Sequence, residues 1–138
     1  MEYNSCFFSS FFFITNAIVA YIYEYYFYAM SFLSLTITSL IIHTNYNIYT
    51  NILDKIAIFS IFSYGLFLFV VKVYTNDTFY EHIMSVIIFL TFAATVYLYI
   101  YGYYTKSYCF CEDVNVGNLY HSLLHFISSI GHHLLTIL

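Results

Sequence analysis

The sequence predicts an all-α fold, a polytopic transmembrane helix bundle of about five spans in a single domain, residues 1–138. Its composition carries this prediction: 62% of the residues are hydrophobic and only 7% are charged, whereas a soluble domain carries about 25% charged residues. An aromatic share of 25% excludes a disordered chain, which is poor in such residues. Three basic residues and a net charge of −4 argue against nucleic-acid binding, which needs a basic face. The class that remains is an integral, multi-pass membrane protein.

The positions of the charged residues delimit the spans. Between them lie uncharged, mostly apolar runs, and about 17 to 25 such residues in a helix cross a hydrocarbon core ~30 Å thick. The predicted spans cover approximately residues 6–23, 26–42, 54–71, 82–101 and 119–138. The third span is expected to be the shortest, and Asp54 is expected to begin it.

The first span, residues 6–23, is apolar and close to the N-terminus, so a signal peptide is the alternative interpretation. A signal peptide begins with basic residues and ends at a cleavage site flanked by small residues. The residues before this span include Glu2 and no lysine. This composition favours a membrane span.

The next three spans are predicted to be helices rather than strands of a barrel. Barrel strands are about 10 residues long and alternate apolar with polar positions, whereas residues 57–71 and 85–97 are apolar on every face. Tyrosines gather near the expected helix ends, at 21–28 and 97–104, where an amphipathic ring fits the headgroup region. A codon bias towards tyrosine would explain their number equally well.

The last span, residues 119–138, contains four of the six histidines. His121 and His125 are four residues apart, so their imidazoles share one helix face, a spacing that suits two ligands of one metal ion. Ser39 and His43 have the same spacing on the second span. Because polar residues are costly inside a membrane, these positions are candidates for function.

Topology places these candidates in one leaflet. The second span ends near His43, the third begins near Asp54 on the same side, and the fifth span enters from that side through His121 and His125. Three neutral imidazoles leave a fourth tetrahedral position for water, as in catalytic zinc sites. Imidazole ligands favour Zn²⁺ over Mg²⁺ or Ca²⁺. Asp54 is then the candidate to hold or deprotonate the water, and Ser39 to hydrogen-bond the water or a developing oxyanion.

The ordered pattern Ser39-x-x-x-His43, then Asp54, then His121-x-x-x-His125 resembles the signature of the CREST superfamily. That superfamily includes alkaline ceramidases, progestin and adipoQ receptors, haemolysin III-like proteins and relatives of a GPI-anchor phospholipase. Its members are seven-helix bundles that bind zinc through the histidines, and characterised members hydrolyse amide or ester bonds in lipids.

The resemblance implies that His43, His121 and His125 are zinc ligands and that Asp54 and Ser39 are catalytic or supporting groups. This chain has room for five helices rather than seven, so it corresponds to a shortened version of the family. Removal of a pair of helices between the third and the last keeps the His-x-x-x-His motif on the same side of the membrane.

The leading functional hypothesis is a membrane-embedded, zinc-dependent hydrolase of a lipid amide or ester bond, similar to a ceramidase, with a metal-activated water as nucleophile and membrane lipid as its partner. The alternative is a non-enzymatic multi-pass membrane protein, receptor-like or haemolysin III-like, with a structural zinc site. A degenerate chain without retained function is the third interpretation.

Two further features carry less information. Cys109 and Cys111 form a Cys-x-Cys pair in the predicted loop 102–118, and without a second pair they are interpreted as unpaired thiols rather than a zinc site. His132 and His133 lie about 11 Å or more beyond His125 along the helix. They are therefore expected in the opposite leaflet or at its interface, too far away to share a metal with His121.

Overall fold

The computed structural model describes residues 5–45 and 47–138, and within them it contains helices and no strand. The elements are α1 (Ser5–Ser9), α2 (Phe12–Ile22), α3 (Tyr26–Thr44), α4 (Ile48–Thr75), α5 (Phe79–Val96), the π-helix η1 (Tyr97–Tyr101), α6 (Gly102–Thr105), the 3₁₀ helix η2 (Tyr108–Phe110) and α7 (Val114–Ile137). The prediction of an all-α bundle is confirmed.

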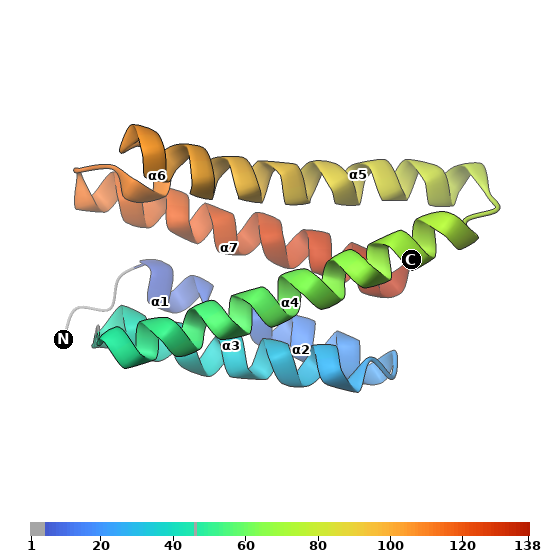
Figure 1. The fold of residues 1–138 in the computed structure, drawn as a ribbon, viewed down its shortest axis with the longest axis horizontal. Helices are drawn as coiled ribbons and strands as arrows, with labels where there is room; N and C mark the ends of the chain where they lie inside the picture. The colour runs from blue at the N-terminus through green and yellow to red at the C-terminus, as the bar shows by residue number, and fades with distance from the viewer. Residues whose placement is uncertain (1–4, 46) are drawn as a thin grey trace.

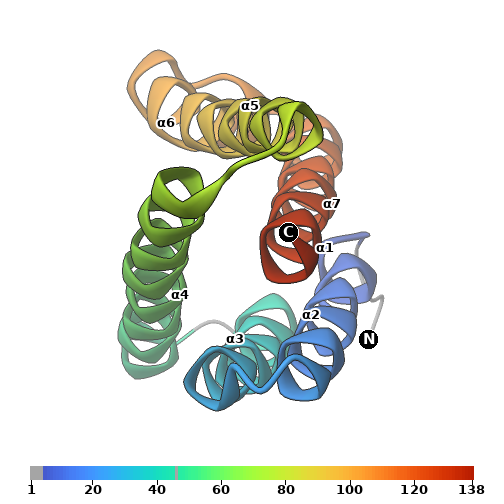
Figure 2. The ribbon, with the colours of Figure 1, turned by 90° about the vertical axis from the view of Figure 1, so that its right-hand side faces the viewer.

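The helices run roughly along one long axis (Figure 1). Seen end-on, they follow one another in the order α2, α3, α4, α5 and α7, so that α7 closes the bundle beside α1 and α2 (Figure 2). The most extensive packing joins α2 to α3, α3 to α4, and α5 to α7. Helix α7 also contacts α1 and α2, so the last helix of the chain packs against the first two.

Side-chain caps fix where three of the helices begin. Asn47 accepts a hydrogen bond from the backbone N–H of Tyr49 at 2.9 Å and begins α4. Thr78 and Glu81 form a reciprocal capping box at the start of α5. Asp113 accepts from the N–H of Asn115 at 2.9 Å and begins α7. Such caps satisfy backbone donors that have no partner within the helix.

The third predicted span differs from expectation in both length and start. Helix α4 has 28 residues and is the longest α-helix among those described, rather than the shortest. Asp54 does not begin it, because the Asn47 cap starts the helix at Ile48. Six residues of helical rise place Asp54 about 9 Å inside the helix. The apolar run alone misses this start because the first turns of α4 are polar.

The first predicted span is interrupted. Helix α1 ends at Ser9 and α2 begins at Phe12. Ser9 and Ser10 both donate their hydroxyls back to the carbonyl of Cys6, at 3.1 and 2.8 Å. Serine side chains that bond to the backbone in this way compete with regular helix. The break turns both serines inwards, where they are buried.

Four helical segments within the described residues are long and apolar enough to cross a membrane: Ser5–Ile22, Tyr26–Thr44, Ile48–Thr75 and Phe79–Phe110. The fifth predicted span is also helical, as part of α7, but it is not among these four. Its histidines and serines lower its hydropathy. The predicted loop 102–118 is shorter than expected, because α6 and α7 take up most of it.

Helix α7 buries a polar face, and this arrangement positions the candidate site. His125, Ser129, His132 and Thr136 are buried at spacings of three or four residues. The Ser129 hydroxyl donates to the Asn16 side chain at 2.6 Å, and Asn16 donates to the Ser129 carbonyl at 2.9 Å. His132 hydrogen-bonds the Tyr28 hydroxyl. Ser129 and His132 thus meet partners on α2 and α3, whereas His125 pairs with Ser9 of α1 and Thr136 donates to the His132 carbonyl of its own helix.

The apolar core surrounds this polar face. Tyr28, Phe32, Ile88 and Leu135 are fully buried, and the rings of Phe32 and His132 lie 5.1 Å apart in an edge-to-face contact. His132 therefore lies in the interior rather than at an interface. His133 is half-buried and contacts the Thr15 hydroxyl at 2.9 Å.

Candidate metal centre

Three histidines meet at one end of the bundle. His43 lies in the last turn of α3, and His121 and His125 lie in the first half of α7. One nitrogen from each ring falls within 4.8 Å of the others. Figure 1 shows that the C-terminal end of α3 and the N-terminal ends of α4 and α7 share this end of the molecule. The structure thus brings together the three residues that are predicted from the sequence as metal ligands.

The imidazole rings pack against one another. The ring centroids of His43 and His121 are 5.2 Å apart, those of His121 and His125 4.8 Å, and those of His43 and His125 5.7 Å. In the described part of the chain, the side chains of His43 and His121 take part in these ring contacts and in no side-chain hydrogen bond. Their nitrogen lone pairs are therefore available to a ligand.

The cluster fits a metal ion by its donor set. Three nitrogens bound to one tetrahedral zinc ion at ~2.0–2.1 Å lie about 3.3 Å apart. The nitrogens here lie within 4.8 Å of one another, so side-chain rotations that shorten these separations by at most about 1.5 Å would bring all three into ligand range. Three neutral imidazoles suit Zn²⁺ and other borderline metals better than Mg²⁺ or Ca²⁺.

A buried serine fixes the orientation of His125. The Ser9 hydroxyl lies 2.8 Å from Nδ1 of His125 and 3.1 Å from the Cys6 carbonyl, to which it donates its one proton. When that proton goes to the Cys6 carbonyl, Nδ1–H of His125 donates to Ser9 and Nε2 keeps its lone pair for a ligand. Metal-binding histidines characteristically use the second ring nitrogen in this way.

Asp54 lies beside the cluster and is not one of its members. Its carboxylate is buried and accepts hydrogen bonds from the Thr38 hydroxyl at 3.1 Å and from Nζ of Lys55 at 3.3 Å. Its charge acts on the His43 imidazole. Asp54 therefore places a negative charge next to the histidine cluster, and that charge is paired with Lys55.

Ser39 is buried one turn before His43 and faces Ser10. The two hydroxyls lie 2.8 Å apart, and Ser10 donates its own proton to the Cys6 carbonyl. Ser39 must therefore donate to Ser10. Because Ser10 lies in the turn between α1 and α2, this hydrogen bond ties α3 to that turn.

Three residues at this centre were missed by the sequence analysis. Ser9 and Ser10 are more than 100 positions from α7 in the sequence, and no local pattern predicts that the broken first helix supports His125. Lys55 is half-exposed, and its charge acts on all three imidazoles. In the sequence, its position next to Asp54 is the feature that could have indicated a place at this centre.

Cys109 and Cys111 are free thiols and are only partly buried. This agrees with the interpretation of unpaired loop thiols. They are not members of the histidine cluster.

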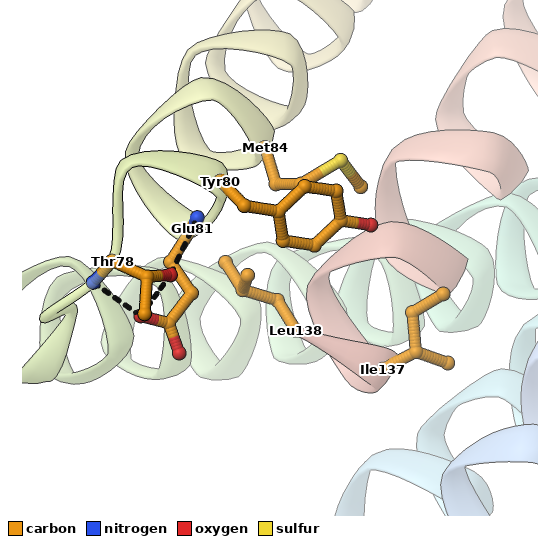
Figure 3. Close-up of a pocket in the computed structure, with 6 residues that line it drawn as sticks. All are labelled: Thr78, Tyr80, Glu81, Met84, Ile137 and Leu138. Carbon is orange, nitrogen blue, oxygen red and sulfur yellow. Dashed lines mark hydrogen bonds between the residues drawn. The ribbon is translucent and has the colours of Figure 1, made fainter.

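A cavity of about 200 Å³ lies at the opposite end of the bundle, between the start of α5 and the end of α7. Thr78, Tyr80, Glu81, Met84, Ile137 and Leu138 line it (Figure 3). One carboxylate oxygen of Glu81 is held by the capping box of α5. The cavity is thus separate from the histidine centre.

Together, the fold and the cluster define a helical bundle with a three-histidine centre near one end. Comparison of the chain with protein-family models, with curated proteins and with solved structures finds no match.

Proposed function

We propose that the chain is a multi-pass integral membrane protein whose helices cross the bilayer along the long axis of the bundle. Large apolar side chains cover the outside of α4 and α5: Phe59 is 70% exposed, Phe67 59% and Leu90 59%. A continuous surface of this kind is rare on a protein in water, whereas it matches the hydrocarbon of a bilayer. The histidine centre then lies near one membrane surface.

The function that this geometry supports best is zinc-dependent hydrolysis of an amide or ester bond in a membrane lipid. His43, His121 and His125 would hold the ion. When bound there, zinc supplies a Lewis acid that polarises a carbonyl oxygen and activates water. The single observation that carries the proposal is the convergence of three imidazoles from two helices at one end of the bundle.

The chain's own residues perform three tasks around that centre. Ser9 holds His125 with Nε2 directed to the ligand. Asp54 offers a carboxylate beside His43. This carboxylate is able to accept a proton once its hydrogen bond to Lys55 is broken. Lys55, with its side chain half-exposed, is available to attract an anionic oxygen as charge develops. The resemblance of the Ser39, His43, Asp54, His121 and His125 pattern to the CREST superfamily supports the same assignment.

One observation favours a second candidate, a structural metal site in a non-enzymatic membrane protein. Asp54 is occupied by Thr38 and Lys55, and the Ser39 proton is directed to Ser10. In that arrangement the metal would tie the end of α3 to α7 and take no part in turnover.

An activity assay separates the two candidates. Purified protein in vesicles is given one lipid with a fluorescent N-acyl amide and one with a fluorescent acyl ester, and release of the fatty acid is followed. The hydrolase proposal expects release that stops on chelation of the metal, returns with Zn²⁺, and is lost in Asp54→Asn although the metal is retained. Asp77→Asn, which changes an exposed acid near the opposite end of the bundle, serves as the matched control. A metal-loaded protein that releases no fatty acid from either lipid class supports the structural site instead.

A further inference from the structure

A second cleft lies at the same end of the bundle as the histidines, on the side of α6 and η2. It has a volume of about 470 Å³. Its wall includes Tyr101, Thr105, Lys106, Ser107, Tyr108 and Tyr120. None of these residues belongs to the metal centre.

Aromatic rings make up one side of this cleft. Tyr101 lines the cleft and stacks on Tyr97, with the ring centroids 4.9 Å apart and an interplanar angle of 12°. Tyr108 lies 6.3 Å from Tyr101 and 5.1 Å from Tyr120. Several tyrosine rings gathered around one space provide the electron-rich faces that bind quaternary ammonium groups.

Lys106 provides the positive charge of the cleft. The ion pair found among the described residues joins Lys55 to Asp54, so no described carboxylate neutralises Lys106. Its Nζ lies 5.0 Å from the centroid of the Tyr103 ring, which is outside the cleft wall. A lysine without an anionic partner beside a row of rings is suited to an anion that also carries an apolar or cationic group.

The backbone that carries Lys106 and Tyr108 adopts an uncommon conformation. Lys106 and Tyr108 both have positive φ, 55° and 51°, which non-glycine residues rarely adopt. Two bonds hold the turn: the N–H of Ser107 donates to the Gly102 carbonyl at 3.1 Å, and the hydroxyls of Thr105 and Ser107 lie 2.6 Å apart. The preceding π-helix, Tyr97–Tyr101, is a further irregularity of a kind that is frequent at functional sites.

We propose that this cleft binds the phosphocholine headgroup of a membrane lipid, with the phosphate at Lys106 and the trimethylammonium group at the rings of Tyr101, Tyr108 and Tyr120. A purely anionic headgroup would use the lysine and leave the rings idle. The acyl chains of such a lipid would extend along the apolar surface of the bundle.

This proposal stands apart from the metal centre. Phosphocholine binding needs neither zinc nor turnover, so a protein stripped of metal by a chelator is expected to bind it equally well. Failure of the hydrolase proposal would therefore leave the headgroup site intact, and the reverse also holds.

The test measures binding to the purified full chain in a maltoside detergent, which contains no choline. The probes are soluble phosphocholine and a dihexanoyl phosphatidylcholine below its micelle concentration. The proposal expects saturable binding of both, tighter for the lipid, with competition by choline as well as by inorganic phosphate. Absence of saturable binding, or competition by phosphate without competition by choline, would overturn it.

Variants locate the site. Lys106→Asn removes the charge and keeps a residue that tolerates positive φ, and Tyr101→Leu removes a ring; each is expected to weaken binding at least tenfold. Tyr101→Phe keeps the ring, and Tyr104→Leu changes an exposed tyrosine of α6 that does not line the cleft; both are expected to stay within twofold of the unmodified protein. Equal binding by all four variants would contradict the proposed position. The competition experiment on the unmodified chain decides the chemistry even if one variant fails to fold.

Discussion

The hydroxyl of Ser9 lies 2.8 Å from Nδ1 of His125, although the two residues are 116 positions apart in the sequence. This hydrogen bond joins the broken first helix to the helix that carries two of the three clustered imidazoles. When Nδ1 carries the proton of the ring, this bond leaves Nε2 free for a ligand. The first helix thus acts as a support for the candidate metal centre.

Loss of the Ser9 hydroxyl should weaken metal binding without abolishing it. In Ser9→Ala, Nδ1 of His125 loses its partner, and removal of a partner of this kind typically reduces metal affinity about 10- to 100-fold. Competition with a chromophoric zinc chelator measures the change. Ser34→Ala, which removes an exposed serine that bonds only to its own helix, should leave the affinity unaltered. Equal affinities in the two variants would show that Ser9 does not orient a ligand.

Asp54→Asn tests the charge beside the cluster. The amide keeps an acceptor for the Thr38 hydroxyl but loses the ion pair with Lys55. We expect the fold and the metal content to be retained, and lipid hydrolysis to fall at least 100-fold, because general-base catalysis contributes about 10²–10⁴ in rate. Circular dichroism and metal analysis verify the first expectation, and the fatty-acid release assay the second. Unchanged hydrolysis would remove Asp54 from the mechanism.

Gly131→Ala should loosen the packing of α5 on α7. A Cβ atom at Gly131 would collide with the hydroxyl of Thr91 and would lie 3.1 Å from its Cβ and 3.2 Å from the Phe92 ring. Overpacking of this kind costs about 1–3 kcal/mol, so the midpoint of thermal unfolding should fall.

The same substitution at Gly117 is its matched control. There the nearest atom to an added Cβ is the Cys111 carbonyl oxygen at 3.4 Å, and alanine gains up to about 1 kcal/mol in helix propensity. Gly117→Ala should therefore be neutral or stabilising. A drop in both midpoints, or in neither, would contradict the packing argument.

The reciprocal bonds between Asn16 and Ser129 should couple α2 to α7. Asn16→Ala, Ser129→Ala and the double variant form a thermodynamic cycle, and interhelical hydrogen bonds in membrane bundles contribute about 0.6 kcal/mol on average and at most about 1.7. Unfolding in a denaturing detergent gives the three free-energy changes. Strictly additive effects would mean that the two side chains stabilise the bundle independently.

The sequence predicts the histidine centre well because the positions of its residues follow from helix periodicity and from the order of the helices. His121 and His125 share a face through helix periodicity, and helix topology alone places His43 at the same depth. It predicts the surroundings of the centre poorly, because these depend on contacts between distant segments. Ser9 reaches His125 only after the first helix breaks, and the Asn47 cap places Asp54 within α4 instead of at its start.

The inward orientation of the polar face of α7 has the same physical origin. An apolar run predicts a span from hydropathy, but His132 and Ser129 are buried against Tyr28 and Asn16. Those partners belong to helices that local patterns do not pair with α7. A long helix with buried polar groups is therefore recognised from its contacts rather than from its hydropathy.

The metal content of the purified protein tests the central claim most directly. Inductively coupled plasma mass spectrometry of protein purified without chelators should find about one zinc ion per chain. The same value is expected in His82→Ala, which removes an exposed histidine, and nearly none in His121→Ala. A wild-type protein without metal, or equal metal in His121→Ala and the wild type, would contradict the account.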